Sequence, residues 1–226
     1  LVGWWPLNGT LEDKSINNLN LCVYNDSNSI VIEPTGVLGS CYSRTTVSPE
    51  ALTTSDGILL SGSFTMACWA FVTTTDNIAN GLVTNHNHTT NSGAGITVKK
   101  ISDIDVRISC NTGNGTSRTY ATYYGTTNIY NKWAHLVLRY DAILKEITLW
   151  VDGIKEKTVN NYNMYCVEDK VALFAWSTGY LHSSAYRPIC KLNDVRIYNH
   201  ALSTKEIKEL AKCKVLHYTF NQFQEP

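Results

Sequence analysis

The segment Ser63–Val72 restricts the possible folds more than any other part of the chain. Side chains alternate between the two faces of an extended strand, and this segment would present apolar residues on both faces. One face carries Phe64, Met66, Cys68, Ala70 and Val72, and the other carries Trp69 and Phe71. Two apolar faces are typical of a strand that is covered on both sides. We therefore expect a central strand here, with Cys68 as a small core residue.

Two further segments, Asp105–Cys110 and Ile147–Val151, alternate in the way expected of strands. Asp152 and Gly153 follow the second segment directly and precede Ile154. An Asp-Gly pair between two strands predicts a two-residue type I′ turn, because both of its positions need a positive φ. Long polar connections occupy residues 73–80, 111–130 and 177–188. The pattern is that of antiparallel strands joined by turns and loops.

One helix is indicated, near the end of the chain. Ser203 and Glu206 have the spacing of a capping box, in which each side chain accepts a hydrogen bond from the other residue's backbone N–H group. Ile207, Leu210 and Ala211 follow at helical spacing, so one side of a short helix can pack on a sheet. No low-complexity linker interrupts residues 1–212, which we interpret as one domain.

The balance of charges excludes several classes of protein. Charged residues make up 17% of the 226-residue chain, and the 19 Lys and Arg residues balance the 19 Asp and Glu residues. Without a long basic segment, the sequence lacks the electrostatic signature of a nucleic-acid-binding protein. No apolar stretch approaches the roughly 20 residues of a membrane-spanning helix, so we expect no membrane insertion. The chain starts at Leu1 without a signal peptide, which indicates a trimmed N-terminus.

The cysteines give an expectation about the compartment. There are seven of them: Cys22, Cys41, Cys68, Cys110, Cys166, Cys190 and Cys213. Their number is odd, and no Cys-x-x-Cys pair or metal-ligand spacing occurs. We expect free thiols and assembly in a reducing compartment. One or two disulfides are the alternative.

Four segments, in order along nearly all of residues 1–212, match one family pattern. They are Gly3–Gly9 with Leu11–Asn17, Ser61–Trp69, Trp133–Gly153 and Asn193–Ile207. Together they resemble the laminin-G-like (concanavalin A-like jelly-roll) superfamily, whose closing pattern D-x-V-R-I-Y-N-R-A-L-S is the most specific. The resemblance implies an all-β fold, an antiparallel two-sheet jelly-roll sandwich with one short C-terminal helix. It also implies that His135 has a structural role, because it occupies the His position of the family's Trp-x-His strand.

Residues 213–226 are expected to be a linking strand or the start of a following unit. Lys214–Asn221 repeats the pattern of Leu1–Asn8, which indicates a modular parent chain. Laminin-G-like units followed by such a segment resemble those of tailed-phage virion proteins. The alternative is a terminal strand that pairs within the same domain.

Residue patterns for catalysis are missing. Glucanases on this fold carry an E-x-D-x-x-E strand motif, whose alternation directs paired carboxylates into one cleft. The nearest match, Ser102–Ile108, has Asp103 and Asp105 but neither glutamate. No G-x-S-x-G motif, phosphate-binding loop or dinucleotide fingerprint occurs. We therefore expect that the chain is not an enzyme.

Aromatic and polar residues gather in two long connections and one short segment. The candidate ligand-binding residues are Trp176, Tyr180, His182, Tyr186, Arg187, Tyr120, Tyr123, Tyr124, His86 and His88. Aromatic faces stack on the C–H groups of sugars while polar groups bind their hydroxyls, so these residues form the predicted ligand site. The alternatives are that the aromatic residues pack beneath loops or form a protein interface, and that the histidines are incidental to a polar loop.

The superfamily often holds one structural calcium ion between two carboxylates. The resemblance places these on Asp13 and Asp194, with Asn17, Asn20 and backbone carbonyls as further oxygen ligands. Calcium takes roughly six to eight oxygens, of which these supply only a part. The alternative is that the two carboxylates only fix turns.

Two functions remain open. The first is a non-catalytic module of a virion tail, fibre or capsid-decorating protein, for assembly and for attachment to host-surface glycans. The second is a carbohydrate-binding module of a secreted or cell-surface bacterial protein. The expected partners are glycans or virion proteins, with oligomers formed through the parent protein. The expected location is the virion or, in the alternative, the extracellular space or cell surface.

Overall fold

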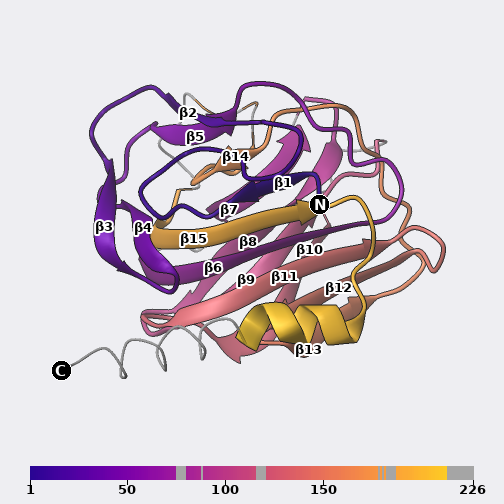
Figure 1. Ribbon diagram of the computed structural model, residues 1–226. Coiled ribbons are helices and arrows are strands. Elements are labelled where there is room, and N and C mark those ends of the chain that lie inside the picture. The colour runs from indigo at the N-terminus through magenta and orange to yellow at the C-terminus, as the bar shows by residue number, and fades with distance from the viewer. Residues whose placement is uncertain are drawn as a thin grey trace.

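The computed structural model describes residues 1–74, 80–87, 89–115, 121–177, 179, 181 and 187–212. Two antiparallel sheets lie face to face in a sandwich (Figure 1). In spatial order, the eight-stranded sheet consists of β13 (Ile154–Val159), β12 (Glu146–Val151), β11 (Trp133–Asp141), β6 (Phe64–Thr74), β15 (Ile189–Tyr198), β4 (Gly39–Arg44) and β3 (Ile30–Gly36), with β1 (Gly3–Trp5) paired to β15. The seven-stranded sheet consists of β10 (Ala121–Asn128), β9 (Asp105–Thr112), β8 (Ser92–Ser102), β7 (Asn80–Asn87), β14 (Ala172–Leu173), β5 (Ala51–Thr54) and β2 (Leu21–Tyr24).

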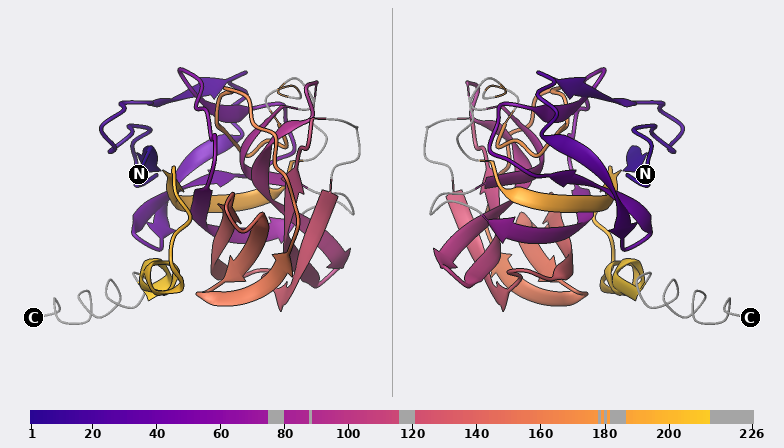
Figure 2. Two further views of the ribbon diagram at one scale, coloured as in Figure 1. Left: turned by 90° about the vertical axis from the view of Figure 1, so that its right-hand side faces the viewer. Right: turned by 90° about the vertical axis from the view of Figure 1, so that its left-hand side faces the viewer.

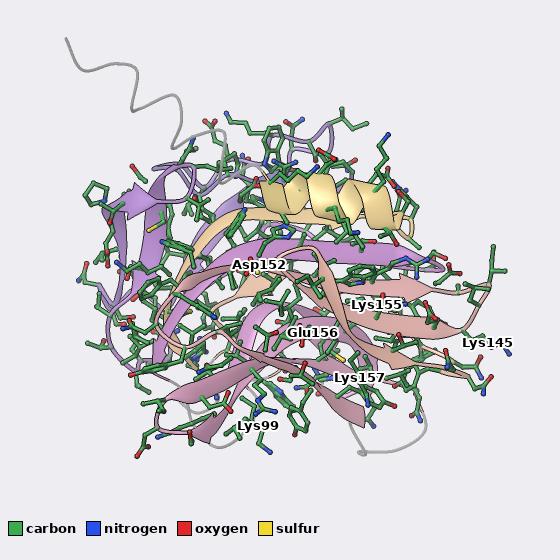
Figure 3. The ribbon with its side chains drawn as sticks, turned by 90° about the horizontal axis from the view of Figure 1, so that it is seen from below. Lys99, Lys145, Asp152, Lys155, Glu156 and Lys157 are labelled. Atoms are coloured by element: carbon green, nitrogen blue, oxygen red, sulfur yellow. The ribbon has the colours of Figure 1, made fainter. Side chains whose placement is uncertain are left out.

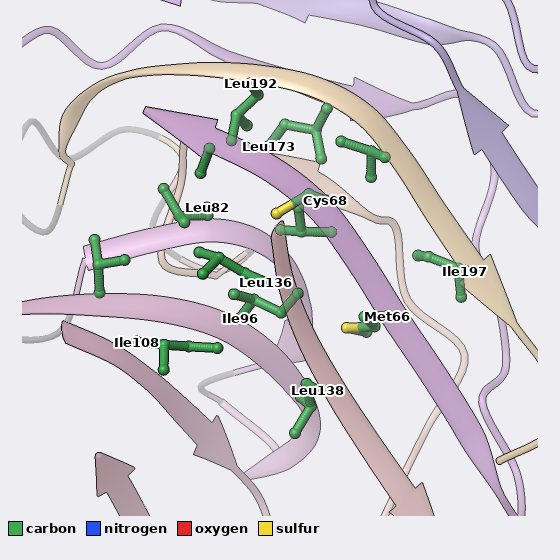
Figure 4. Close-up of a cluster of buried hydrophobic side chains, with 14 of the residues drawn as sticks. Met66, Cys68, Leu82, Ile96, Ile108, Leu136, Leu138, Leu173, Leu192 and Ile197 are labelled. Carbon is green, nitrogen blue, oxygen red and sulfur yellow. The ribbon is translucent and has the colours of Figure 1, made fainter. Parts of the chain in front are cut away.

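The core fills the space between the two sheets (Figure 4). Apolar side chains that are fully buried come from both sides: Met66, Cys68 and Leu136 from the eight-stranded sheet, and Leu82, Ile96 and Ile108 from the seven-stranded sheet. Burial of this apolar surface is the main favourable contribution to folding. The predicted all-β sandwich is confirmed.

Strand β6 is central, as its two apolar faces predict. It pairs with β11 on one side and β15 on the other. Its core face carries the predicted apolar set, and on its outer face Ala67 packs with Val137, Trp150 and Ile207. Ile207 belongs to a helix over residues 204–212, which lies on the outside of the eight-stranded sheet (Figure 2). Both faces of β6 are therefore covered.

The two predicted local motifs are present. Asp152 and Gly153 have φ values of 50° and 76°, as a type I′ turn between β12 and β13 requires. The Ser203 N–H donates to Glu206 Oε2 at 2.7 Å, and the Glu206 N–H donates to Ser203 Oγ at 3.3 Å. This capping box begins the C-terminal helix.

A single carboxylate joins the edges of the two sheets. Glu156 on β13 accepts hydrogen bonds from the backbone N–H groups of Thr126 and Thr127 on β10, at 2.8 and 2.9 Å. The hydroxyl groups of both threonines donate to the same carboxylate. An edge of one sheet is thereby tied to an edge of the other, and neither is left open at this place.

No disulfide joins the six cysteines that lie within the described residues. Cys41, Cys68, Cys110 and Cys190 are buried, and Cys22 is exposed. Burial raises the pKa of the Cys110 thiol to about 12 and that of Cys41 to about 11, so both stay protonated at neutral pH. These six cysteines are unpaired in the structure, whereas the redox state of all seven thiols and the reducing compartment stay predictions.

The end of the chain, residues 213–226, lies outside the described residues, so its predicted role as a linking strand or following unit stays a prediction. Within the described part of the chain, no helix is both long and apolar enough to cross a membrane.

Candidate functional site

The seven-stranded sheet turns a polar face away from the core. On β8, Ala94, Ile96 and Val98 pack in the core, so the residues between them lie on the opposite face. Thr97 there shares a hydrogen bond of 2.6 Å with Ser109 on β9. Strand register defines this polar face as Thr84, His86, Thr97, Lys99, Arg107, Ser109, Asn111 and Tyr124. Of these, Lys99, Arg107 and Tyr124 are accessible, and the other five are buried.

At one end of the polar face, His86 contacts Trp176. Their ring centroids lie 5.3 Å apart at an angle of 63°, an edge-to-face arrangement. Trp176 is partly exposed, whereas His86 is fully buried. The structure thus brings two predicted residues together, with the indole accessible and the imidazole beneath it.

The segment that carries Trp176 is packed tightly against β7. The Thr84 hydroxyl donates to the Ala175 carbonyl at 3.0 Å, and the Phe174 N–H donates to the Leu82 carbonyl at 3.0 Å. A Cβ atom at Gly81 would lie 2.0 Å from the Ala175 carbonyl oxygen, so only glycine permits this approach. The position of Trp176 is therefore set by the sheet.

Toward the other end of the polar face, Tyr124 and Lys99 interact. The Lys99 ammonium lies 4.8 Å from the centroid of the Tyr124 ring and donates to its hydroxyl at 3.2 Å. Arg107 stands opposite Lys99 across the β8–β9 pair and forms an ion pair of 2.7 Å with Asp105. Tyr124 is 36% exposed, so this end offers an accessible aromatic ring with cationic and anionic groups beside it.

Tyr123 lies on the opposite side of β10 from Tyr124, because side chains alternate along the strand. Its ring packs edge-to-face on Tyr162, with centroids 6.3 Å apart, against the core. Burial raises the pKa of its hydroxyl. The predicted pair is thus separated, and only Tyr124 lies on the polar face.

Arg187 is buried in the scaffold, although it is one of the predicted ligand contacts. Its guanidinium donates to the carbonyls of Glu50 and Leu181 at 2.6 and 2.7 Å. Arg44, also buried, donates to the same Glu50 carbonyl at 2.8 Å. Burial, together with the neighbouring charge of Arg44, lowers the pKa of Arg187 to about 10. Within the described residues, Arg187 thus anchors backbone near the Trp176 segment.

Four other predicted ligand residues, Tyr180, His182, Tyr186 and His88, lie outside the described residues, as does Tyr120. Conversely, Lys99, Arg107 and Thr97 belong to the polar face but were not among the predicted residues. The alternation of Asp105–Cys110 predicts a strand. Which residues of other strands lie beside it on the same face depends on the pairing between strands, and this cannot be predicted from one segment.

The predicted calcium ligands already accept hydrogen bonds. Both oxygens of Asp13 are engaged, by the N–H groups of Trp4, Ser15 and Leu19 at 2.8–2.9 Å and by the Ser15 hydroxyl at 2.7 Å. Burial acts to raise the pKa of Asp13, but these hydrogen bonds outweigh it and lower the pKa. Asp194 Oδ1 accepts from the Trp4 indole at 2.8 Å and from Arg196 at 2.9 Å.

These hydrogen bonds are made to the same carboxylate oxygens that would coordinate calcium in the predicted site. No group of three or more His, Cys, Asp or Glu side chains in the described residues could hold a metal ion. Calcium binding stays a prediction, which calorimetry with calcium after chelation tests.

The two aspartates nearest to a glucanase motif are not arranged as a pair. Asp103 forms an ion pair with Lys100 at 2.6 Å, and its side chain is 93% exposed. Asp105 is paired with Arg107. Each carboxylate therefore has its own cation.

A family model described as the concanavalin A-like lectin/glucanases superfamily matches residues 48–208. None of the curated proteins matches the chain in sequence.

Solved structures share the fold at low sequence identity. Domain 4 of AbnA, an extracellular arabinanase from Geobacillus stearothermophilus solved with arabinotriose, has a TM-score of 0.69 and 16% identity, covering 93% of this chain and 98% of that one. The receptor-binding domain of the botulinum neurotoxin C/D mosaic serotype has a TM-score of 0.69 and 11% identity, covering 95% and 51%. The binding domain of Paraclostridial mosquitocidal protein 1 has a TM-score of 0.64 and 17% identity, covering 89% and 49%. The chain thus spans about half the length of these toxin domains.

Proposed function

The chain belongs to the concanavalin A-like lectin/glucanase superfamily, and from this premise we propose that it is a non-catalytic module that binds glycans on the polar face of its seven-stranded sheet. The observation that carries the proposal is the placement of two accessible aromatic side chains, Trp176 and Tyr124, toward opposite ends of that face. Between them lie Thr97, Ser109 and Asn111 of β8 and β9, whose side chains are buried, so the two aromatic rings and the charged groups beside Tyr124 are the parts that a glycan would contact.

The chemistry of the two ends suits sugars. An indole or phenol ring offers a flat apolar surface to the C–H groups of a pyranose. Beside Tyr124, Lys99 and Arg107 supply hydrogen-bond donors and Asp105 supplies acceptors, which is the combination that sugar hydroxyls require. The buried hydroxyls of Thr97 and Ser109 form a hydrogen bond with each other and so keep β8 and β9 in register.

Two similar structures support a binding role. The arabinanase domain was solved with a bound oligosaccharide, and the neurotoxin domain is a receptor-binding domain. The absence of a carboxylate pair at Asp103 and Asp105 supports the non-catalytic part of the proposal.

We further propose that the parent protein is a virion component and that the glycans are those of a host surface. The unpaired state of the six described cysteines and the repeat of the N-terminal pattern in Lys214–Asn221 support this. A carbohydrate-binding module of a secreted or cell-surface bacterial protein is the alternative. The genes next to the parent gene distinguish the two: virion genes favour the first, and a signal peptide or linked glycosidase favours the second.

A glycan array tests the binding function. The wild-type chain should bind a defined set of glycans, and Trp176→Ala and Tyr124→Ala should each weaken that binding. Trp133→Ala is the matched control, because Trp133 is a partly exposed tryptophan on the other sheet. Failure of the wild type to bind any glycan would overturn the proposal. Equal losses of glycan binding in all three variants would show that the glycan does not bind on the polar face.

A further inference from the structure

The chain contains three Asn-Gly pairs, and the structure gives each a different environment. They are Asn8–Gly9, Asn80–Gly81 and Asn114–Gly115, and all lie within the described residues. In such a pair the glycine nitrogen can attack the side-chain amide carbon of the asparagine, since glycine has no Cβ atom to obstruct the approach. The attack requires an accessible side chain, a glycine N–H group that is free to lose its proton, and space for the backbone to rotate.

Asn80–Gly81 is enclosed by the sandwich. The Asn80 side chain is fully buried, and the pair lies in β7, which is paired with β8. A Cβ atom at Gly81 would lie 2.0 Å from the Ala175 carbonyl oxygen, so the neighbouring backbone leaves no space for rotation. The pair is therefore protected as long as this part of the sandwich is folded.

Asn114–Gly115 is exposed, but its backbone is held in place. The Gly115 N–H donates to the Asn91 carbonyl at 3.0 Å, and this hydrogen bond must break before the nitrogen can react. A Cβ atom at Gly115 would lie 3.0 Å from the Tyr165 ring, which packs against the glycine. Rotation of the backbone is therefore restricted at this pair.

Hydrogen bonds also hold the Asp152–Gly153 turn, just before β13 (Figure 3). An Asp-Gly pair can form the same ring by loss of water. Asp152 Oδ1 accepts the His135 N–H at 2.8 Å, and the Asp152 N–H donates to the His135 carbonyl at 2.8 Å. Both the side chain and the backbone of Asp152 are therefore fixed.

Asn8–Gly9 is free in all three respects. Both residues are exposed in the segment that follows β1. Apart from the chain neighbours of Gly9, no heavy atom lies within 4 Å of the place where its Cβ atom would be, and its φ is 102°. Within the described part of the chain, neither the Asn8 side chain nor the Gly9 N–H forms a hydrogen bond. The geometry therefore favours reaction at this pair over the other two.

We propose that Asn8 is a site of spontaneous deamidation, and that it reacts first in the folded chain because the fold protects the other two pairs. Hydroxide removes the Gly9 amide proton, and the nitrogen forms a bond to Asn8 Cγ. The bond between Cγ and the amide nitrogen breaks, and ammonia leaves with a proton from water. Water then opens the resulting cyclic imide at either carbonyl, which gives aspartate or isoaspartate at position 8. Oxidation states do not change, and water is the only co-reactant.

The backbone is anchored on both sides of the reacting pair. Before it, the Asn193 amide donates to the Pro6 carbonyl at 2.8 Å, and Leu7 is fully buried. After it, Asp13 accepts a backbone N–H group of β1 at 2.9 Å. Isoaspartate lengthens the backbone between these anchors, and both products add a negative charge to a chain whose formal net charge is zero. The modification does not depend on the proposed glycan site.

Peptide mass spectrometry of the folded chain, incubated at mildly alkaline pH, tests the proposal. The peptide that contains Asn8 should deamidate at least about tenfold faster than those with Asn80 or Asn114, because the latter two pairs must first open locally. Asn114 is the matched comparison, since Asn8 and Asn114 are both followed by Gly and Thr. In urea, where the fold protects neither, the peptides with Asn8 and Asn114 should react at similar rates.

Asn8→Gln is the matched variant. Its side chain is one methylene longer and closes an imide far more slowly, so the acidic species that accumulates in ion exchange of the wild type should be missing. An unchanged melting temperature establishes that the variant folds. The proposal is overturned if Asn80 or Asn114 reacts as fast as Asn8 in the folded chain, or if the excess of Asn8 over Asn114 persists in urea. Accumulation of the acidic species by the variant at the wild-type rate would also overturn it.

Discussion

Replacing Glu156 with Gln should lower the free energy of unfolding at neutral pH, because this carboxylate ties β13 to β10. It accepts two backbone N–H groups and two hydroxyl groups from Thr126 and Thr127. Gln keeps one acceptor oxygen but loses the charge and sets an NH₂ group against donors. Hydrogen bonds to a charged group contribute about 1.5–3 kcal/mol each in buried sites. Since Glu156 is only partly buried, we expect a total loss of about 1–2 kcal/mol.

The loss should depend on pH in a defined direction. Burial acts to raise the pKa of Glu156, but the hydrogen bonds from Thr126 and Thr127 outweigh it and lower the pKa below 4.5. A depressed folded-state pKa gives stability that is present above the unfolded value and is lost as pH falls through the folded value. The difference in the free energy of unfolding between the wild type and the variant should therefore be largest at neutral pH and should decrease in acid.

Urea unfolding at neutral pH and at about pH 3 measures both effects. Glu12→Gln is the matched control, because Glu12 is exposed and pairs only with Lys14, so its loss should be near zero. Equal stability of the Glu156 variant and the wild type at neutral pH would refute the reasoning. A deficit that persists unchanged in acid would show that the lost charge is not the cause.

Three further predictions concern the fold. Ser203→Ala should destabilise the C-terminal helix and lower the free energy of unfolding by about 1 kcal/mol, seen in thermal melts, whereas Ser203→Asp should retain most of the stability; no change with Ala would contradict the cap. In the native protein a thiol reagent should label Cys22 quickly and should label the buried Cys68, Cys110 and Cys190 only after urea is added, as followed by mass spectrometry. Early labelling of the three buried cysteines would contradict their placement. Gly153→Ala should cost about 1 kcal/mol in urea unfolding because its φ is 76°, and a neutral result would argue against the type I′ turn.

Local patterns predicted a large part of the fold. The alternation around Cys68 identified the central strand, the Asp152–Gly153 pair identified a hairpin, and Ser203 with Glu206 located the helix start. Each of these signals is contained in a few consecutive residues. The physics that decides them acts over the same short range, through alternation, positive φ and capping.

Long-range pairing explains what the sequence did not reveal. Lys99 and Tyr124 lie side by side only because β8 and β10 both pair with β9. The hydrogen bond between Thr126 and Glu156 forms only when both sheets are in place. The alternation of β10 also separated Tyr123 from Tyr124, although they are adjacent in sequence. Arg187 is polar and follows an aromatic loop, which suggests a ligand contact, but a buried arginine satisfied by backbone carbonyls has the same sequence signature.

The central claim is that glycans bind on the polar face of the seven-stranded sheet. Proton–nitrogen correlation spectra of the chain, recorded with increasing amounts of the strongest glycan from the array, test it most directly. The account predicts shifts of the Trp176 indole signal and of the backbone signals of Lys99 and Tyr124, with the Trp133 indole unchanged. Shifts confined to the outer face of the eight-stranded sheet would contradict it.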